Sequence, residues 1–187
     1  MHPSDSSLQI QGFTEQGTLQ DEEIASAMGV LPSRHLQQLC SVNCDFAQDS
    51  LRKDSESSSL HSSTSRIQGR YYPDRKEIYI YDCSSKWTIL YTLFHEIGHH
   101  VYSWHCPDVL RSFWREKVEP NSPPVSKYGT TDPEESFAES YMHYILEPFF
   151  QRKESLRFNR LKFYFMTRAV FYDQNLNVRV LRQILTP

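Results

Sequence analysis

The stretch Trp87-Thr88-Ile89-Leu90-Tyr91-Thr92-Leu93-Phe94-His95-Glu96-Ile97-Gly98-His99 decides the fold of this chain. Large apolar residues recur at helical spacing along it and just beyond it, at Leu90, Leu93, Phe94, Ile97 and Val101. This pattern predicts a buried α-helix. Residues four positions apart lie on one face of a helix, so the imidazoles of His95 and His99 can bind the same metal ion. The H-E-x-x-H spacing is typical of zinc-binding helices, and Glu96 would act on a zinc-bound water as general base. The stretch therefore predicts one zinc ion per chain and hydrolysis of an amide bond.

An alternative is that His95, Glu96 and His99 are ordinary polar residues whose partners lie within the core. Burying two imidazoles and a carboxylate on an apolar helix without partners or a metal is unfavourable, and this favours the metal site. His100 and His105 fall off the face shared by the pair. We expect both to be ordinary polar residues.

Length and composition limit the classes of protein. With 187 residues the chain can form one domain with a substantial core. The net charge is −3 and no dense Lys/Arg cluster occurs, which argues against a nucleic-acid partner. No apolar run approaches a membrane span, and residues 1–7 lack the basic and apolar regions of a Sec signal peptide. We therefore expect a soluble chain that is cytoplasmic or exported by another route, and leave its oligomeric state open.

The chain divides into three expected parts. Residues 1–17 are polar and predict a flexible tail, and residues 18–65 predict a helical element followed by a Ser-rich loop. Within the second part, Thr18 is a candidate cap for a helix ending near Gly29, and Ser33 a candidate cap for a second helix. That second helix would carry Leu36, Leu39 and Cys40, and would make Cys40 and Cys44 neighbours. Residues 66–187 form the expected catalytic domain.

Two β-rich runs, residues 69–72 and 77–81, precede the metal helix and are separated by a turn sequence, which predicts a hairpin. Tyr79 and Tyr81 would share one face of the second strand. A free strand edge beside a metal site can pair with an extended peptide, so Tyr79 and Tyr81 are candidate substrate-binding residues. A purely structural hairpin is the alternative.

Further helices are predicted after the metal helix. Asp132 and Pro133 form a typical N-cap and first helical position, and the helix they start would end at Pro148. Shorter helices are expected at residues 111–118, 155–171 and 178–185. The expected fold class is thus α+β, mostly helical, with a small β-hairpin before the metal helix.

A catalytic zinc ion usually has three protein ligands, so one ligand is still missing. The downstream candidates are Glu116, Glu119, Glu134, Glu135, Glu139 and His143. Glu135, Glu139 and His143 form a stripe along one helix face, which suits one ligand and one carboxylate supporting a ligand imidazole. Glu135 also occupies the position of a capping-box glutamate, and it cannot fill both roles at once.

The motif at residues 95–99 and the later block Tyr128-Gly129-Thr130-Thr131-Asp132-Pro133-Glu134-Glu135-Ser136-Phe137-Ala138-Glu139 together resemble a known family. They are similar to the zincin metallopeptidases related to the anthrax lethal factor catalytic domain and to the Pro-Pro endopeptidases. In that family a tyrosine precedes the ligand glutamate by seven residues and a second glutamate follows it by four. Tyr128, Glu135 and Glu139 reproduce both intervals.

The resemblance covers about residues 66–172 and implies a zincin-like metallopeptidase fold. It makes His95, His99 and Glu135 the zinc ligands and Glu96 the general base. It also implies that Tyr128 stabilises the oxyanion and that Glu139 contacts a metal ligand without binding the metal itself. A phenol aimed at a developing oxyanion would stabilise its charge, which agrees with the role of Tyr128. Members of the family are typically secreted or carried by toxins, whereas this chain shows no signal peptide and carries the Ser-rich loop in addition.

The preferred interpretation is a zinc metalloendopeptidase that cuts a protein or peptide substrate. One alternative is a catalytically silent zincin-fold binding or sensor module, although a silent module needs neither Glu96 nor Tyr128. Another is a peptide deformylase-like hydrolase with Cys83 or Cys106 as third ligand. The four cysteines show no C-x-x-C spacing and are expected to be reduced thiols.

Overall fold

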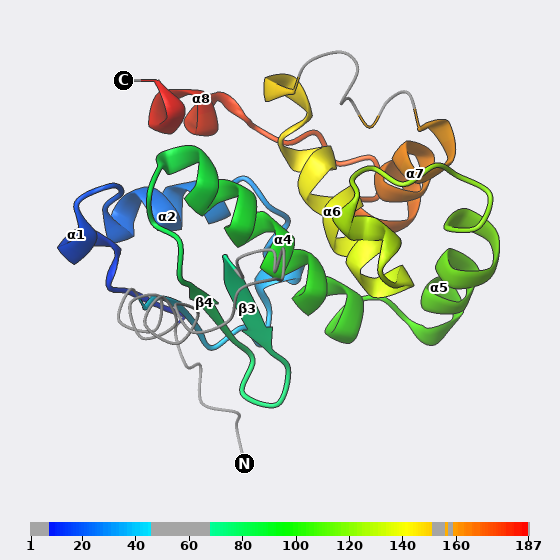
Figure 1. The fold of residues 1–187 in the computed structure, drawn as a ribbon, viewed down its shortest axis with the longest axis horizontal. Helices are drawn as coiled ribbons and strands as arrows, with labels where there is room; N and C mark the ends of the chain where they lie inside the picture. Colours follow the sequence, from blue (N-terminus) through cyan, green and yellow to red (C-terminus); the bar gives the residue numbers. More distant parts are fainter. Residues whose placement is uncertain (1–7, 46–67, 151–155, 157–158, 187) are drawn as a thin grey trace, which may run out of the picture.

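The protein combines a small mixed sheet with helices that cover it and extend beyond it. The structure, a computed structural model, describes residues 8–45, 68–150, 156 and 159–186. Helix α4 (Lys86–Trp104) runs through the middle, with the sheet on one side and α6 (Pro133–Ile145) on the other (Figure 1). Beyond α6 lie α5 (Asp108–Phe113) and α7 (Arg160–Phe165). The α+β class predicted from the sequence is confirmed.

The sheet has the strand order β1-β2-β4-β3. Its strands are β1 (Gln9–Gln11), β2 (Ser41–Cys44), β3 (Gly69–Tyr72) and β4 (Glu77–Ile80). β1 and β2 pair in parallel, as do β2 and β4, whereas β3 pairs antiparallel with β4. The predicted hairpin is therefore confirmed, and β3 is an edge strand on the side of α4.

The N-terminal part joins this sheet, which corrects two predictions. Residues 9–16 are not a flexible tail, because they form β1 and the short helix α1 (Phe13–Gln16). Helix α2 (Asp21–Met28) lies where a helix was predicted, but Gln20 caps it through a reciprocal pair with Glu23. Thr18, the predicted cap, donates its hydroxyl hydrogen to the Cys83 carbonyl at 2.8 Å instead.

The predicted second N-terminal helix is wrong. Only a 3₁₀ turn forms at Ser33–Leu36, and the chain then enters β2. Gln38 has a φ of 67°, a left-handed conformation that ends helical structure. Asn43 then fixes β2 in the sheet through hydrogen bonds to the Gln11 side chain and the Ile78 carbonyl. Cys40 and Cys44 are consequently not helix neighbours, and the Ser-rich loop lies outside the described residues.

The helix pair α4 and α6 has the start signals that the sequence predicts. Ser85 caps α4 by accepting a hydrogen bond from the Thr88 backbone N–H. Asp132 caps α6 by accepting hydrogen bonds from the next two glutamate N–H groups, with Pro133 in the first turn. Gly98 brings the helices close together, because a β-carbon there would lie 2.8 Å from Ala138 Cα. The middle of α6 therefore packs against α4 at Gly98, and the first turn of α6, which carries Glu135, lies close to the same helix.

The remaining elements cover α6 and the N-terminal helices. A π turn at Trp114–Val118 follows α5, and another at Met166–Val170 follows α7. Helices at residues 111–118 and 178–185 are confirmed in outline, the second as α8 (Arg179–Leu185). The predicted start at Ser155 lies outside the described residues. Among the described helices, none has both the length and the apolar character that crossing a membrane requires.

Candidate metal centre

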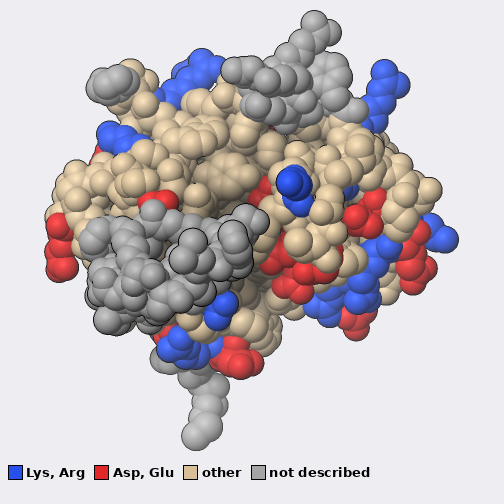
Figure 2. All heavy atoms as spheres, in the orientation of Figure 1, with Lys and Arg blue, Asp and Glu red and all other residues tan. Residues whose placement is uncertain are grey.

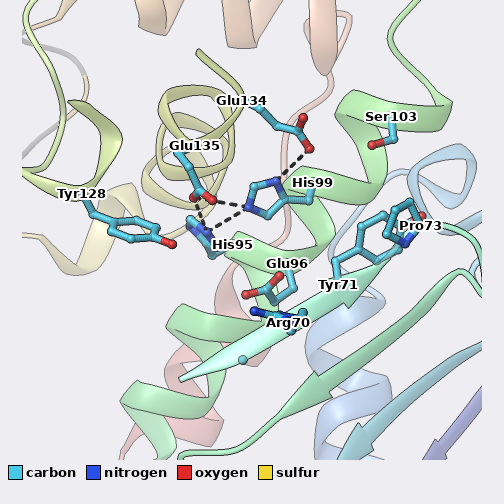
Figure 3. A pocket seen from close by; sticks show the side chains of 11 residues that line it. Arg70, Tyr71, Pro73, His95, Glu96, His99, Ser103, Tyr128, Glu134 and Glu135 are labelled. Atoms are coloured by element: carbon cyan, nitrogen blue, oxygen red, sulfur yellow. Dashed lines mark hydrogen bonds and ion pairs between the residues drawn. The ribbon is translucent and has the colours of Figure 1, made fainter. Parts of the chain in front are cut away.

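Three potential ligand atoms converge where α4 meets the first turn of α6 (Figure 3). The Nε2 atoms of His95 and His99 lie 3.2 Å apart. Glu135 Oε2 lies 3.2 Å from the His95 nitrogen and 3.4 Å from the His99 nitrogen. These three residues could therefore hold a metal ion between them.

The contacts of the Glu135 carboxylate also fit a metal ion. Its Oε2 atom is buried, yet it makes no hydrogen bond of regular geometry to any described residue. A buried carboxylate oxygen is unfavourable unless a cation, here either the protonated imidazoles or a metal ion in their place, completes its surroundings. Two imidazole nitrogens and one carboxylate oxygen are a donor set that catalytic zinc sites use. The capping-box alternative for Glu135 is not what forms, because its side chain turns to the imidazoles.

Each of the two imidazoles contacts a different carboxylate through its Nδ1 atom. His95 Nδ1 lies 2.9 Å from Glu139 Oε1, and His99 Nδ1 lies 3.1 Å from Glu134 Oε1. Such contacts keep the proton on Nδ1 and direct Nε2 toward a metal ion. The sequence predicts this role for Glu139. From the sequence, Glu134 is only a candidate metal ligand. Its position next to Glu135 at the start of α6 could have indicated that it lies close to the metal site.

Glu139 is itself held in place. It is almost completely buried, and the Tyr91 hydroxyl donates a hydrogen bond of 3.2 Å to its Oε2 atom. The next residue of the predicted stripe, His143, stacks on Phe150 with ring centroids 4.2 Å apart. His143 is therefore not among the residues that converge on the metal site.

The charges of the cluster stabilise one another. Burial disfavours a charged His95, but the neighbouring carboxylates of Glu135 and Glu139 outweigh burial and raise its pKa to about 9. Burial likewise opposes charge on His99, whose pKa rises to about 10 beside Glu134 and Glu135. Burial alone would raise the pKa of Glu135, yet the two imidazoles lower it to about 2. A metal ion would take the place of the protons that these imidazoles otherwise hold.

Glu96 lies beside the cluster in the same cavity. Its side chain is buried, which raises the pKa of its carboxyl, and the Tyr71 backbone N–H donates a hydrogen bond to it. A carboxylate next to a metal site can accept a proton and return it, and a raised pKa makes it a stronger base. β3 therefore holds Glu96 from the side opposite α6.

Tyr128 approaches the cluster from the turn before α6. The 3₁₀ turn Tyr128–Thr130 places its ring 5.8 Å from the His95 ring, centroid to centroid. Burial and the nearby Glu135 and Glu96 carboxylates raise its pKa to about 12, so the phenol keeps its proton. It is 49% exposed, and its hydroxyl can therefore donate a hydrogen bond to a ligand in the cavity.

A cavity of about 300 Å³ opens between β3, α4 and the start of α6. It is lined by Glu96 and Tyr128 together with the three potential metal ligands. Acidic side chains gather on the surface where α4 and α6 lie side by side (Figure 2). The structure thus brings His95, Glu96, His99, Tyr128 and Glu135 to one cavity.

Tyr79 and Tyr81 are not brought to this cavity. The alternation of side chains along β4 places Tyr79 on the sheet face opposite the one that packs on α4. There it contacts Tyr72, whose hydroxyl also lies 3.1 Å from that of Tyr81. β4 is paired on both sides, so the free edge beside the metal site belongs to β3.

The other predicted ligand candidates lie elsewhere. Among the described residues, His95, His99 and Glu135 are the only group of potential metal ligands close enough to share an ion. Neither Cys83 nor Cys106 belongs to it. Burial raises the pKa of the Cys106 thiol to about 12, which leaves it a poor metal ligand.

His100 turns away from the metal cluster, as expected. It donates from Nε2 to the Gln37 carbonyl at 3.0 Å and accepts from the Tyr71 hydroxyl at 2.9 Å. It therefore links α4 to β3 and to the loop before β2.

Comparison of the chain with protein-family models and with curated proteins finds no match. The resemblance to the zincin metallopeptidases therefore rests on the two sequence blocks that carry it.

Proposed function

We propose that this chain is a zinc-dependent endopeptidase of zincin-like fold. The observation that carries the proposal is a single cavity lined by a His-His-Glu ligand group, a buried carboxylate and a protonated phenol. Metal-assisted peptide hydrolysis uses these three functions together: a Lewis acid, a proton acceptor and a donor to the developing oxyanion.

His95, His99 and Glu135 would hold the zinc ion. When bound, zinc supplies a Lewis acid that polarises the substrate carbonyl and makes water more acidic. Glu134 and Glu139 keep the two imidazoles in the tautomer that leaves Nε2 free for the metal.

Glu96 and Tyr128 would carry the proton transfers and the charge stabilisation. Glu96 accepts a proton from the attacking water and later delivers it to the leaving amine. Tyr128 donates a hydrogen bond to the oxygen that becomes negative when the carbonyl is attacked. The high pKa of Tyr128 supports this role, because a phenol near pKa 12 stays a donor across the physiological range.

The test compares wild type with Glu96→Ala for bound zinc and for cleavage of a randomised peptide library. We expect about one zinc per chain in both proteins and cleavage by wild type alone. Glu116→Ala is the matched control, because Glu116 is exposed and lies outside the cavity. Zinc binding without cleavage by any protein would favour the silent zincin module, and absence of zinc binding would refute the proposal.

A further inference from the structure

Among the described residues that line the cavity, Arg70 is the only lysine or arginine. The acidic residues of the lining are Glu96, Glu134 and Glu135 (Figure 3). An anionic substrate group entering this cavity would be repelled by three carboxylates. His95 and His99, or the metal ion they would hold, balance part of this charge at the ligand group. Arg70 is the lining side chain outside that group that can attract an anion.

The Arg70 guanidinium keeps its hydrogen-bond donors available. Its side chain is exposed, and the ion pairs of the described residues do not include it. Its closest aromatic neighbour is Tyr72, whose ring centroid lies 6.0 Å from the guanidinium carbon, at the limit of a cation–π contact. By contrast, Arg75 on the same hairpin lies 3.5 Å from Glu77 and stacks over Tyr72 at 4.5 Å.

Arg70 pairs with Tyr79 in the sheet register, so its side chain leaves β3 on the face away from α4 and lines the cavity from the free edge of this strand. The register also shows which residues of β3 lie next to Glu96. The Tyr81 N–H donates to the Gln68 carbonyl, so in this antiparallel pair Arg70 exchanges hydrogen bonds with β4. The peptide groups of Gly69 and Tyr71 consequently face the free edge. Gly69 packs on Glu96, because a β-carbon there would lie 3.5 Å from Glu96 Cγ, and Tyr71 donates its N–H to the same carboxylate.

Arg70 thus lies between the two residues of β3 that touch the proposed general base. An extended substrate that pairs with the free edge of β3 would therefore pass Arg70 next to the residues that contact Glu96. A charged side chain at that place can contribute to substrate selection without taking part in proton transfer.

We propose that Arg70 is a specificity-determining residue that selects peptides carrying a carboxylate next to the scissile bond. The carboxylate is that of an aspartate or glutamate side chain, or the C-terminal carboxylate of a short peptide. Arginine recognises either group through paired N–H donors. The proposal rests on the proposed peptidase function, because it names the peptides that such an enzyme would select.

Equilibrium binding tests the proposal separately from turnover. The probes are fluorescent short peptides of neutral composition, in which one glutamate is moved from position to position and paired with the same peptide carrying glutamine. C-terminally amidated and free-acid forms distinguish the two sources of the carboxylate. Anisotropy gives Kd for zinc-loaded Glu96→Ala and for Glu96→Ala combined with Arg70→Gln or, as control, Arg75→Gln.

We expect at least one glutamate position, or the free C-terminus, to strengthen binding about tenfold over its neutral partner. Arg70→Gln should abolish that preference, Arg75→Gln should retain it, and Arg70→Glu should reverse it in favour of lysine. Equal binding of acidic and neutral peptides would overturn the proposal, even if the wild-type protein cleaves both. A preference that depends on Arg70 without any cleavage by wild type would support it while refuting the peptidase function.

Discussion

Replacing Gly98 with alanine should separate the two helices that carry the metal ligands. A β-carbon at this position would lie 2.8 Å from Ala138 Cα, and ordinary van der Waals contact begins near 3.4 Å. The neighbour is backbone of α6, so a side-chain rotation cannot relieve the contact. Glu135 lies one turn before Ala138, and its ligand oxygen must move with the helix.

Two opposing terms set the size of the effect. Overpacking costs about 1–3 kcal/mol, and a contact with backbone belongs near the upper end. Alanine in place of glycine inside a helix contributes about 1 kcal/mol in the other direction. The expected net loss of about 2 kcal/mol lowers Tm by about 4–8 °C in a chain of this size. Because metal–ligand distances vary by only about 0.2 Å, zinc affinity should also fall about tenfold or more.

Thermal unfolding followed by circular dichroism, with excess zinc and with a chelator, measures the stability of wild type and Gly98→Ala. Competition with a chromophoric chelator measures their zinc affinity. Lower Tm in both conditions, together with weaker zinc binding, is the expected result. If Gly98→Ala instead raised Tm and bound zinc as wild type does, helix propensity would dominate and the close contact between α4 and α6 would be wrong.

Three further outcomes are expected. Glu134→Gln should weaken zinc binding by about 10- to 100-fold, because it loosens the support of His99, whereas Glu116→Gln should not. Tyr128→Phe should lower kcat by about 10²- to 10³-fold and leave zinc affinity unchanged. Burial lowers the pKa of His35 to about 3 from 6.5. The unfolded chain therefore binds this proton more readily, and the free energy of unfolding should fall by about 1.4 kcal/mol per unit as pH decreases from 6.5 toward 3.

Each of these has a measurement that can contradict it. Chelator competition giving equal zinc affinity for Glu134→Gln and wild type would remove the support role of Glu134. A Tyr128→Phe variant with full kcat in a peptide assay would exclude the phenol from catalysis. His35 bonds the Val170 carbonyl at 3.1 Å and the Tyr141 hydroxyl at 2.8 Å. Urea unfolding at pH 6.5 and 4.5 gives the free energy of unfolding of each protein, and wild type should lose more of it at the lower pH than His35→Gln does. Equal losses in the two proteins would assign the pH dependence to other groups.

Local patterns were sufficient for α4, for the start of α6 and for the hairpin, although they also predicted a helix after Ser33 that does not form. The apolar spacing around His95 predicts α4, and Asp132 followed by Pro133 predicts the start of α6. These signals act through bonds within a few residues, so no partner element is needed to find them. By contrast, β1 is a short polar strand whose formation depends on pairing with β2, and no local pattern indicates that pairing.

Residues that act through distant partners were harder to find. Glu134 is a partly exposed residue in the first turn of a helix, a position where glutamate is favourable without any further role. Its contact with His99 exists only because α6 packs against α4. Similarly, Arg70 belongs to a strand whose free edge faces the cavity, while the neighbouring strand that carries Tyr79 is paired on both sides.

The sequence by itself determined which chemical groups share one helix face, because the four-residue spacing of His95 and His99 is fixed by helix geometry. It also determined that Glu135 and Glu139 lie one turn apart on a second helix. Only the tertiary structure decided that these two faces meet, with Glu135 Oε2 between 3.2 and 3.4 Å from both imidazole nitrogens. The physical reason is that helix packing depends on non-local contacts such as that of Gly98 with Ala138, which sequence spacing does not encode.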